Sequence, residues 1–134
     1  MSVTIGNRTF DIDGKYLVSH DSRTGRQVFR IAFEHSEYET LKNLAIKAIY
    51  VSPDGQDLVL LFEPAPSGYK RVGNIARVAP TGEVVWWAES TDSGGDTFIA
   101  LEVDQEEIVA TSWECYRCVL DPRTGRILSR TFTK

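Results

Sequence analysis

Short runs of alternating apolar and polar residues cover most of this chain, and glycine-containing pairs separate them. The pairs are Asp13-Gly14, Thr24-Gly25, Asp54-Gly55, Thr81-Gly82 and Thr124-Gly125. β-Branched and aromatic residues, which favour strands, dominate the runs between them. A tight turn between antiparallel strands needs a residue with positive φ, which glycine adopts without a Cβ clash. The pattern therefore predicts an all-β protein built from antiparallel hairpins.

Four stretches depart from this alternation. Apolar residues spaced by three and four near residues 35–45 predict one short helix. Pro64, Pro66 and the Ser90–Asp96 stretch mark two exposed loops between strands. The run Leu58 to Phe62 is apolar at every position, so we expect a strand whose two faces are both covered.

One turn sequence recurs along the chain. Ser22-Arg-Thr-Gly-Arg26 returns as Pro122-Arg-Thr-Gly-Arg126, and Pro80-Thr-Gly-Glu83 is a looser copy. Around these turns, residues 47–89 and 97–133 each predict a four-stranded antiparallel meander of roughly 40 residues, the size of a propeller blade. Residues 1–33 look like a third, incomplete copy. A length of 134 residues suits one domain, so we predict a single β-repeat domain over 1–134.

The repeats carry a family resemblance. The segment 119–128, and less closely 76–86, resembles the Asp-x-x-Thr-Gly-x-x-x-Trp core of quinoprotein-like (PQQ-like) β-propeller repeats. The resemblance covers about half of the chain and implies a partial propeller of under three blades. It implies the fold alone, because the family's quinone and metal sites depend on a complete ring of blades. We carry over no cofactor and no catalytic residue.

A closed propeller needs about four blades or more, so this chain needs another way to cover its sheets. Three sheets can stack as an open partial propeller, or they can curl into a sandwich-like body. Alternatively, two chains can pair through their open strand edges, which makes a homodimer a further hypothesis.

Composition narrows the classes of partner. The net charge of −4 opposes non-specific binding to nucleic acid. The N-terminus lacks the basic and apolar regions of a signal peptide, and no apolar run approaches the ~20 residues that span a bilayer. We therefore expect a cytoplasmic protein without a membrane or nucleic-acid partner.

No catalytic constellation stands out in the sequence. Cys115 and Cys118 form a CxxC pair, but we place both on a strand, where residues three apart point to opposite faces. The only histidines, His20 and His35, are remote from them and from each other, so a zinc site lacks ligands. We predict no metal, no cofactor and no enzymatic activity.

The best binding candidates are aromatic and acidic residues. Trp87, Trp113 and Tyr116 offer large surfaces with a polar end. Asp92, Asp96 and Asp104 lie in loops that would attract a basic partner if they share one end of the sheets.

Two classes of function fit these residues. The first is a non-enzymatic protein-interaction module, for instance a bacterial immunity-type protein that neutralises a partner protein of basic character. The alternative is a small-molecule or carbohydrate-binding β domain that uses the exposed aromatics as a stacking platform.

Overall fold

A computed structural model describes residues 1–34, 44–63, 72–91 and 96–133. This part of the chain holds twelve strands and no helix, and the strands form three four-stranded antiparallel sheets. Sheet 1 contains β1 (Ser2–Ile5), β2 (Arg8–Asp13), β3 (Tyr16–Asp21) and β4 (Gln27–Ala32). Sheet 2 contains β5 (Ile46–Val51), β6 (Leu58–Phe62), β7 (Val72–Val78) and β8 (Val84–Glu89). Sheet 3 contains β9 (Phe98–Val103), β10 (Ile108–Ser112), β11 (Tyr116–Leu120) and β12 (Ile127–Phe132).

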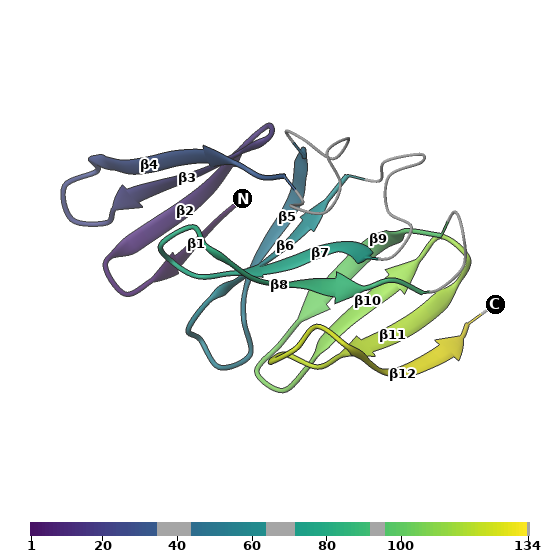
Figure 1. Cartoon of the computed structure of the whole chain (residues 1–134). Helices are drawn as coiled ribbons and strands as arrows, with labels where there is room; N and C mark the ends of the chain where they lie inside the picture. The colour runs from purple at the N-terminus through teal and green to yellow at the C-terminus, as the bar shows by residue number, and fades with distance from the viewer. Residues whose placement is uncertain (35–43, 64–71, 92–95, 134) are drawn as a thin grey trace.

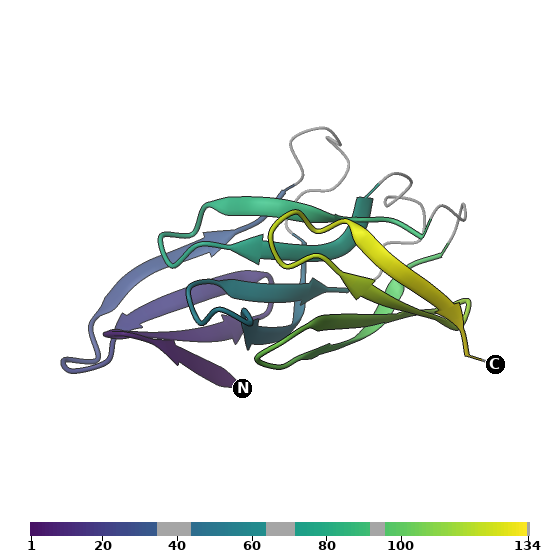
Figure 2. The same ribbon diagram turned by 90° about the horizontal axis from the view of Figure 1, so that it is seen from below.

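Each sheet is a meander in which consecutive strands are neighbours. The three sheets follow one another across the molecule, as adjacent blades of a propeller do (Figures 1 and 2). The first strands lie on the inner side, where β5 contacts β1 and β2 of sheet 1 and β9 of sheet 3. The repeated meanders predicted from the sequence are confirmed, and they are arranged as a partial propeller.

Two expectations change. The first copy is complete rather than truncated, because Gly6, with φ +57°, makes a turn through which β1 pairs with β2. The chain therefore supplies three full sheets, not fewer than three blades. The helix expected near 35–45 falls mostly on residues outside those described, and the described Leu44 and Ala45 are not helical.

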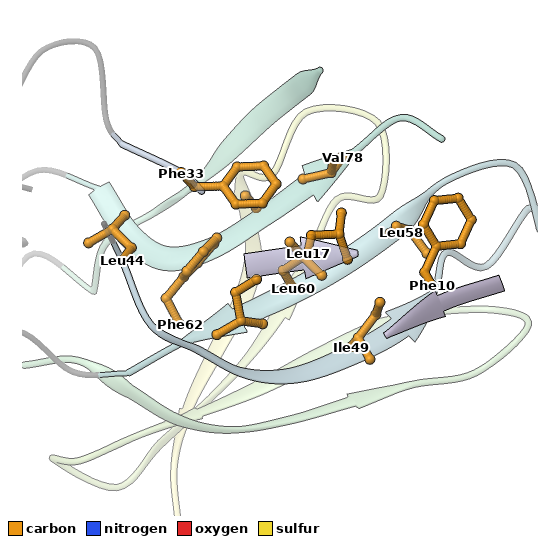
Figure 3. Close-up of a cluster of buried hydrophobic side chains, with 11 residues drawn as sticks. Phe10, Leu17, Phe33, Leu44, Ile49, Leu58, Leu60, Phe62 and Val78 are labelled. Carbon is orange, nitrogen blue, oxygen red and sulfur yellow. The ribbon is translucent and has the colours of Figure 1, made fainter. Parts of the chain in front are cut away.

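Two apolar cores hold the sheets together, one on each face of sheet 2. Figure 3 shows the core between sheets 1 and 2, where Phe10 and Leu17 meet Leu58, Leu60 and Phe62. Val59 and Leu61 point the other way, into the core shared with sheet 3. Every residue of β6 is buried, which confirms the prediction for this strand. Sheet 2 is therefore the central layer.

The repeated Thr-Gly turns form the contacts between neighbouring sheets. Gly25, Gly82 and Gly125 have φ of +73°, +95° and +76°. At Gly125 the ring of Trp86 from sheet 2 lies so close that an added Cβ would be 2.5 Å from its Cε3 atom. The Trp86 indole also donates a 2.9 Å hydrogen bond from Nε1 to the carbonyl oxygen of Pro122. One tryptophan of sheet 2 thus covers the turn of sheet 3.

Sheets 1 and 2 meet in a similar way with smaller side chains. A Cβ added at Gly82 would be 2.6 Å from Cδ1 of Ile31 and 3.7 Å from Cζ of Phe29. Phe29 follows its turn glycine, Gly25, by four residues, as Trp86 follows Gly82. The same repeat position therefore supplies an aromatic contact at both junctions.

The last strand of each sheet, β4, β8 or β12, also contains a bulge at the same repeat position. Register shifts leave Val28 in β4, Val85 in β8 and Leu128 in β12 as the extra residue, and all three are exposed. A bulge bends an edge strand and interrupts its regular ladder of N–H and C=O groups. The three outer edges are consequently poor templates for another strand.

The outward faces of the stack are polar. On sheet 1, opposite the face that carries Phe10, Asp13 pairs with Arg30 at 2.7 Å and Asp11 lies 3.7 Å from His20. On sheet 3, Glu107 lies 3.9 Å from Arg117. Such faces do not need an apolar cover, and terminal units with a polar outer face are typical of repeat proteins.

The contact at Gly125 predicts an unequal effect of two alanine substitutions. Gly55 has a matching φ of +75°, but no described atom lies within 4 Å of its Cβ position. Gly55→Ala should lower the free energy of unfolding by about 1 kcal/mol, the cost of a side chain in the left-handed region. Gly125→Ala should lower it by about 3 kcal/mol, because the methyl group also displaces the Trp86 ring.

Urea unfolding followed by tryptophan fluorescence measures both values. Equal losses in the two variants would contradict a tight contact between Trp86 and Gly125.

Candidate binding groove

An open groove of about 630 Å³ lies between the ends of sheets 2 and 3. The β5–β6 turn forms one wall and the β9–β10 turn forms the other. Its lining residues are Tyr50, Val51, Ser52, Pro53, Asp54, Gly55, Val103, Asp104 and Gln105. The groove therefore combines one aromatic ring, two carboxylates and exposed backbone.

The first wall is a turn built around Asp54. Ser52 donates a hydrogen bond of 2.6 Å from Oγ to Asp54 Oδ1, and the backbone N–H of Gln56 donates to the same oxygen. The Ser52 hydroxyl and the Arg77 guanidinium together lower the pKa of Asp54 from 3.8 to about 2. Asp54 is consequently ionised at neutral pH.

The second wall is held by Asp104. Its Oδ1 accepts hydrogen bonds from the backbone N–H groups of Glu106 at 2.7 Å and Glu107 at 2.9 Å. These two bonds lower the pKa of Asp104 below its usual value. Asp104 thus gives the second wall a negative charge, and the first wall keeps a net negative charge because the single cation Arg77 is shared by Asp54 and Asp57. Asp104 is the one predicted binding residue that lines the groove.

Arg77 anchors the Asp54 turn to the rest of the protein. Its guanidinium is buried and bonds Asp57 from Nε at 2.6 Å and Asp54 from Nη2 at 2.8 Å. It also donates from Nη1 to the carbonyl oxygen of Pro122 in sheet 3, at 2.9 Å. Burial acts to lower the pKa of Arg77, but the two carboxylates raise it, so the side chain stays charged.

Sequence reasoning missed Arg77. A signal was present, because it is the one charged residue in the strand Val72–Val78 and its neighbours Ile75, Ala76 and Val78 are apolar. A charge in the middle of a buried strand requires a partner. The partners lie about 20 residues earlier in the chain, in the Asp54–Asp57 turn.

The reactive side chains that line the groove are hydroxyl and carboxylate groups. Its lining includes no histidine, cysteine or lysine. The Ser52 hydroxyl already donates to Asp54 and accepts from the backbone N–H of Asp57, so it is engaged within the turn. Across the described ranges, no cluster of three or more His, Cys, Asp or Glu side chains is placed to hold a metal ion.

Asp96, also predicted as a binding residue, is buried and structural. It accepts hydrogen bonds from the Thr91 hydroxyl at 2.7 Å and from the backbone N–H groups of Thr97 and Glu114. Burial acts to raise its pKa, but these bonds and one from Ser112 outweigh burial and lower it. Asp96 joins the start of sheet 3 to the β10–β11 turn, whereas Asp92 lies outside the described residues.

The three predicted aromatics do not form one surface. Trp87 packs against Phe62, with ring centroids 5.3 Å apart, in the core between sheets 1 and 2. Tyr116 packs against the core between sheets 2 and 3, with Arg130 stacked on its ring. Trp113 lies in the β10–β11 turn and is 70% exposed. Trp87 and Tyr116 are therefore on opposite sides of sheet 2.

The two cysteines are both free, but only Cys118 lies in a strand. Cys115 lies in the turn before β11 with φ +72°, which corrects its expected place on a strand. Burial raises the pKa of the Cys118 thiol, which makes this thiol less reactive.

A comparison with protein families identifies the chain. The profile of a family described as a domain of unknown function, DUF7957, matches residues 43–132. The chain belongs to this family. The matched region of the DUF7957 protein contains sheets 2 and 3, and with them the groove and the contact of Trp86 with Gly125. No curated protein matches the sequence.

Solved structures similar to this DUF7957 protein include β-propellers. The β-propeller domain of Cps50 (Swd1) from Myceliophteria thermophila has a TM-score of 0.67 at 10% identity, covering 100% of this chain and 43% of that one. The computationally designed protein Ika8 has a TM-score of 0.65 at 16% identity, covering 99% and 36%. BamB from Moraxella catarrhalis has a TM-score of 0.58 at 14% identity, covering 94% and 33%.

The chain thus spans between a third and under a half of the length of these structures. At this level of identity the likeness shows the fold alone, and it confirms the predicted partial propeller. The quinoprotein-like subtype stays a prediction. In the described part of the DUF7957 protein, no helix has the length and hydropathy needed to span a membrane.

The Arg77 contacts predict a large loss of stability on removal of the charge. Arg77→Met should lower the free energy of unfolding by about 3 kcal/mol, because it leaves the Asp57 carboxylate without its charged donor and removes one of the two hydrogen bonds to the Pro122 carbonyl. Arg117→Met removes an exposed pair at 3.9 Å and should cost under about 1 kcal/mol. Urea unfolding of both variants tests this, and similar losses would contradict a structural role specific to Arg77.

The pKa shift of Asp54 predicts how stability depends on pH. A folded-state pKa of about 2, below the ordinary 3.8, stabilises the fold above about pH 4, and this stabilisation is lost as the pH falls toward 2. The melting temperature should therefore drop between about pH 4 and about pH 2. Asp54→Asn should show a smaller drop over the same interval. An unchanged slope in that variant would show that Asp54 does not contribute.

Proposed function

We propose that this protein is a non-enzymatic protein-interaction module that binds a basic segment of a partner protein in the groove between sheets 2 and 3. The observation that carries the proposal is the pair of fixed carboxylates, Asp54 and Asp104, on opposite walls of an open groove. Each is held by hydrogen bonds within its own turn, so the negative charge is positioned before a partner arrives. Such preorganisation lowers the cost of binding.

The other lining groups suit a lysine or arginine side chain. Tyr50 supplies an aromatic surface on which the stem or the guanidinium of a basic residue can stack. Gln105 is exposed beside Asp104 and offers further hydrogen-bonding groups. The net charge of −4 adds a long-range attraction that speeds the encounter with a basic partner.

Titration with an arginine-rich hexapeptide, followed by the backbone amide signals in NMR, tests the proposal. The peptide should shift the amides of Tyr50, Gly55, Asp104 and Gln105, and the shifts should weaken steeply as salt is added. Gln105→Lys places a positive charge in the groove without touching either turn carboxylate, and it should weaken binding about tenfold or more.

Gln27→Lys is the matched control, because Gln27 is exposed on sheet 1 and the substitution changes the net charge by the same amount as Gln105→Lys. This variant should bind the peptide nearly as well as the wild type does. Equal weakening in both variants would show a non-specific charge effect. The proposal is wrong in that case, and also if the shifts map outside the groove.

A further inference from the structure

The Thr-Gly turn of sheet 1 repeats most hydrogen bonds of the turn of sheet 3; the threonine N–H differs, since Thr24 donates to Asp21 Oδ1 and Thr124 to the Asp121 carbonyl. In sheet 1, Gly25 N–H donates to Asp21 O at 2.8 Å, and Asp21 N–H donates to Arg26 O at 2.8 Å. In sheet 3, Gly125 N–H donates to Asp121 O at 2.8 Å, and Asp121 N–H donates to Arg126 O at 2.7 Å.

The side chains of the two turns are also placed alike. Oγ1 of Thr24 and of Thr124 each accepts a 3.3 Å bond from the N–H two residues later. Asp21 and Asp121 each accept a bond from the backbone N–H two residues later, and the φ values of the two glycines differ by only 3° (76 − 73). The two turns therefore present the same surface of backbone.

The two turns differ in what covers them. At Gly125 the Trp86 ring covers the glycine, and the indole N–H bonds to the carbonyl oxygen of Pro122. At Gly25 no described atom lies within 4 Å of the Cβ position. Ser22 has the position in this turn that Pro122 has in the turn of sheet 3. No described residue donates a hydrogen bond to its carbonyl oxygen.

We propose that the Ser22–Arg26 turn is a docking site for a tryptophan side chain of a partner protein. The indole would lie on Gly25, as Trp86 lies on Gly125, and its N–H would donate to the carbonyl oxygen of Ser22. This site is separate from the groove, lies on a different sheet and does not rest on the function proposed for the groove.

The repeat pattern argues against a second copy of this chain as the source of the tryptophan. If a second copy stacked in the same direction, its sheet 3 would lie against this turn. The residue facing Gly25 would then be the one four positions after Gly125, just as Trp86 is four positions after Gly82. That residue is Ser129, which pairs with Val119 as Trp86 pairs with Arg77. A serine cannot provide the ring or the indole N–H, so another copy of this chain does not complete the site in this way.

The surroundings of Gly25 fit a small contact with one anchor. The outer face of sheet 1 next to this turn carries polar groups such as His20, which lies 3.7 Å from Asp11. A single aromatic anchor within a polar rim is a common arrangement at protein interfaces. The partner therefore needs an exposed tryptophan flanked by polar residues.

N-acetyl-tryptophanamide is a suitable probe because it carries the indole without other side chains that could bind elsewhere on the protein. Titration to millimolar concentration should shift the amide signals of Thr24, Gly25 and Arg26 in a saturable way. N-acetyl-leucinamide, which is apolar but lacks an aromatic N–H, should shift them much less. This comparison uses the wild-type protein, so it does not depend on any variant that fails to fold.

Gly25→Ala fills the docking surface and should abolish the saturable shift. Gly14→Ala is the matched control, because Gly14 also has positive φ, +60°, with no described atom within 4 Å of its Cβ position. That variant should respond to the probe as the wild type does.

Three outcomes would overturn the proposal. One is the absence of saturable shifts in residues 22–26, and another is an equal response to the leucine derivative. The third is a shift of the same amides when the unliganded protein is diluted, lost in Trp113→Ala, which would show that the exposed tryptophan of a second copy occupies the turn.

Discussion

Coverage of both faces of sheet 2 is the constraint on which the rest of this structure depends. Every side chain of β6 is buried, so sheet 2 cannot stand at the outside of any stable arrangement. Its two faces need two apolar partners, and sheets 1 and 3 supply one face each. Their other faces carry charges and ion pairs. Sheets 1 and 3 thus cover both apolar faces of sheet 2 without the full ring of blades that a closed propeller has.

The junction between sheets 2 and 3 links stability to the groove. Pro122 O accepts one hydrogen bond from Trp86 and one from Arg77. Arg77 in turn holds Asp54 and Asp57 in the turn that forms one wall of the groove. The Pro122 carbonyl therefore contributes both to the packing of sheet 2 against sheet 3 and, through Arg77, to the position of the Asp54 carboxylate. A substitution in this junction would alter the shape of the groove. The proposed binding therefore has to be tested at Gln105, which lines the groove but takes no part in the junction.

The sequence predicted the parts of the fold that local chemistry determines. Turn glycines such as Gly25 and Gly125 were recognisable because positive φ excludes most other residues. The strand Ser2–Ile5 was missed, because its alternation extends over only four residues and its turn at Gly6-Asn7 differs from the Thr-Gly and Asp-Gly pairs that marked the other turns. Arg77 bonds Asp57, 20 residues earlier, and Asp96 accepts from Glu114, 18 residues later, and spacing along the chain does not reveal such pairs. The shared platform of Trp87 and Tyr116 failed for a related reason: the face to which each strand residue points depends on the order of the sheets.

Repetition of a turn does not imply repetition of its role. The segments 22–26 and 122–126 have nearly the same sequence and share most of their hydrogen bonds, yet Trp86 covers 122–126, whereas no described atom covers Gly25 in 22–26. The difference arises because a repeat contacts its neighbour in one direction only, so a linear stack leaves one docking turn free at one end and one docking strand free at the other. In this chain the free strand carries Ser129, which cannot provide an indole, whereas the free turn keeps the backbone bonds of Gly25 and Asp21 and the side-chain bonds of Asp21 and Thr24 that its covered counterpart has. The two ends of the stack therefore differ chemically, and only the end at sheet 1 retains the means to hold an aromatic side chain.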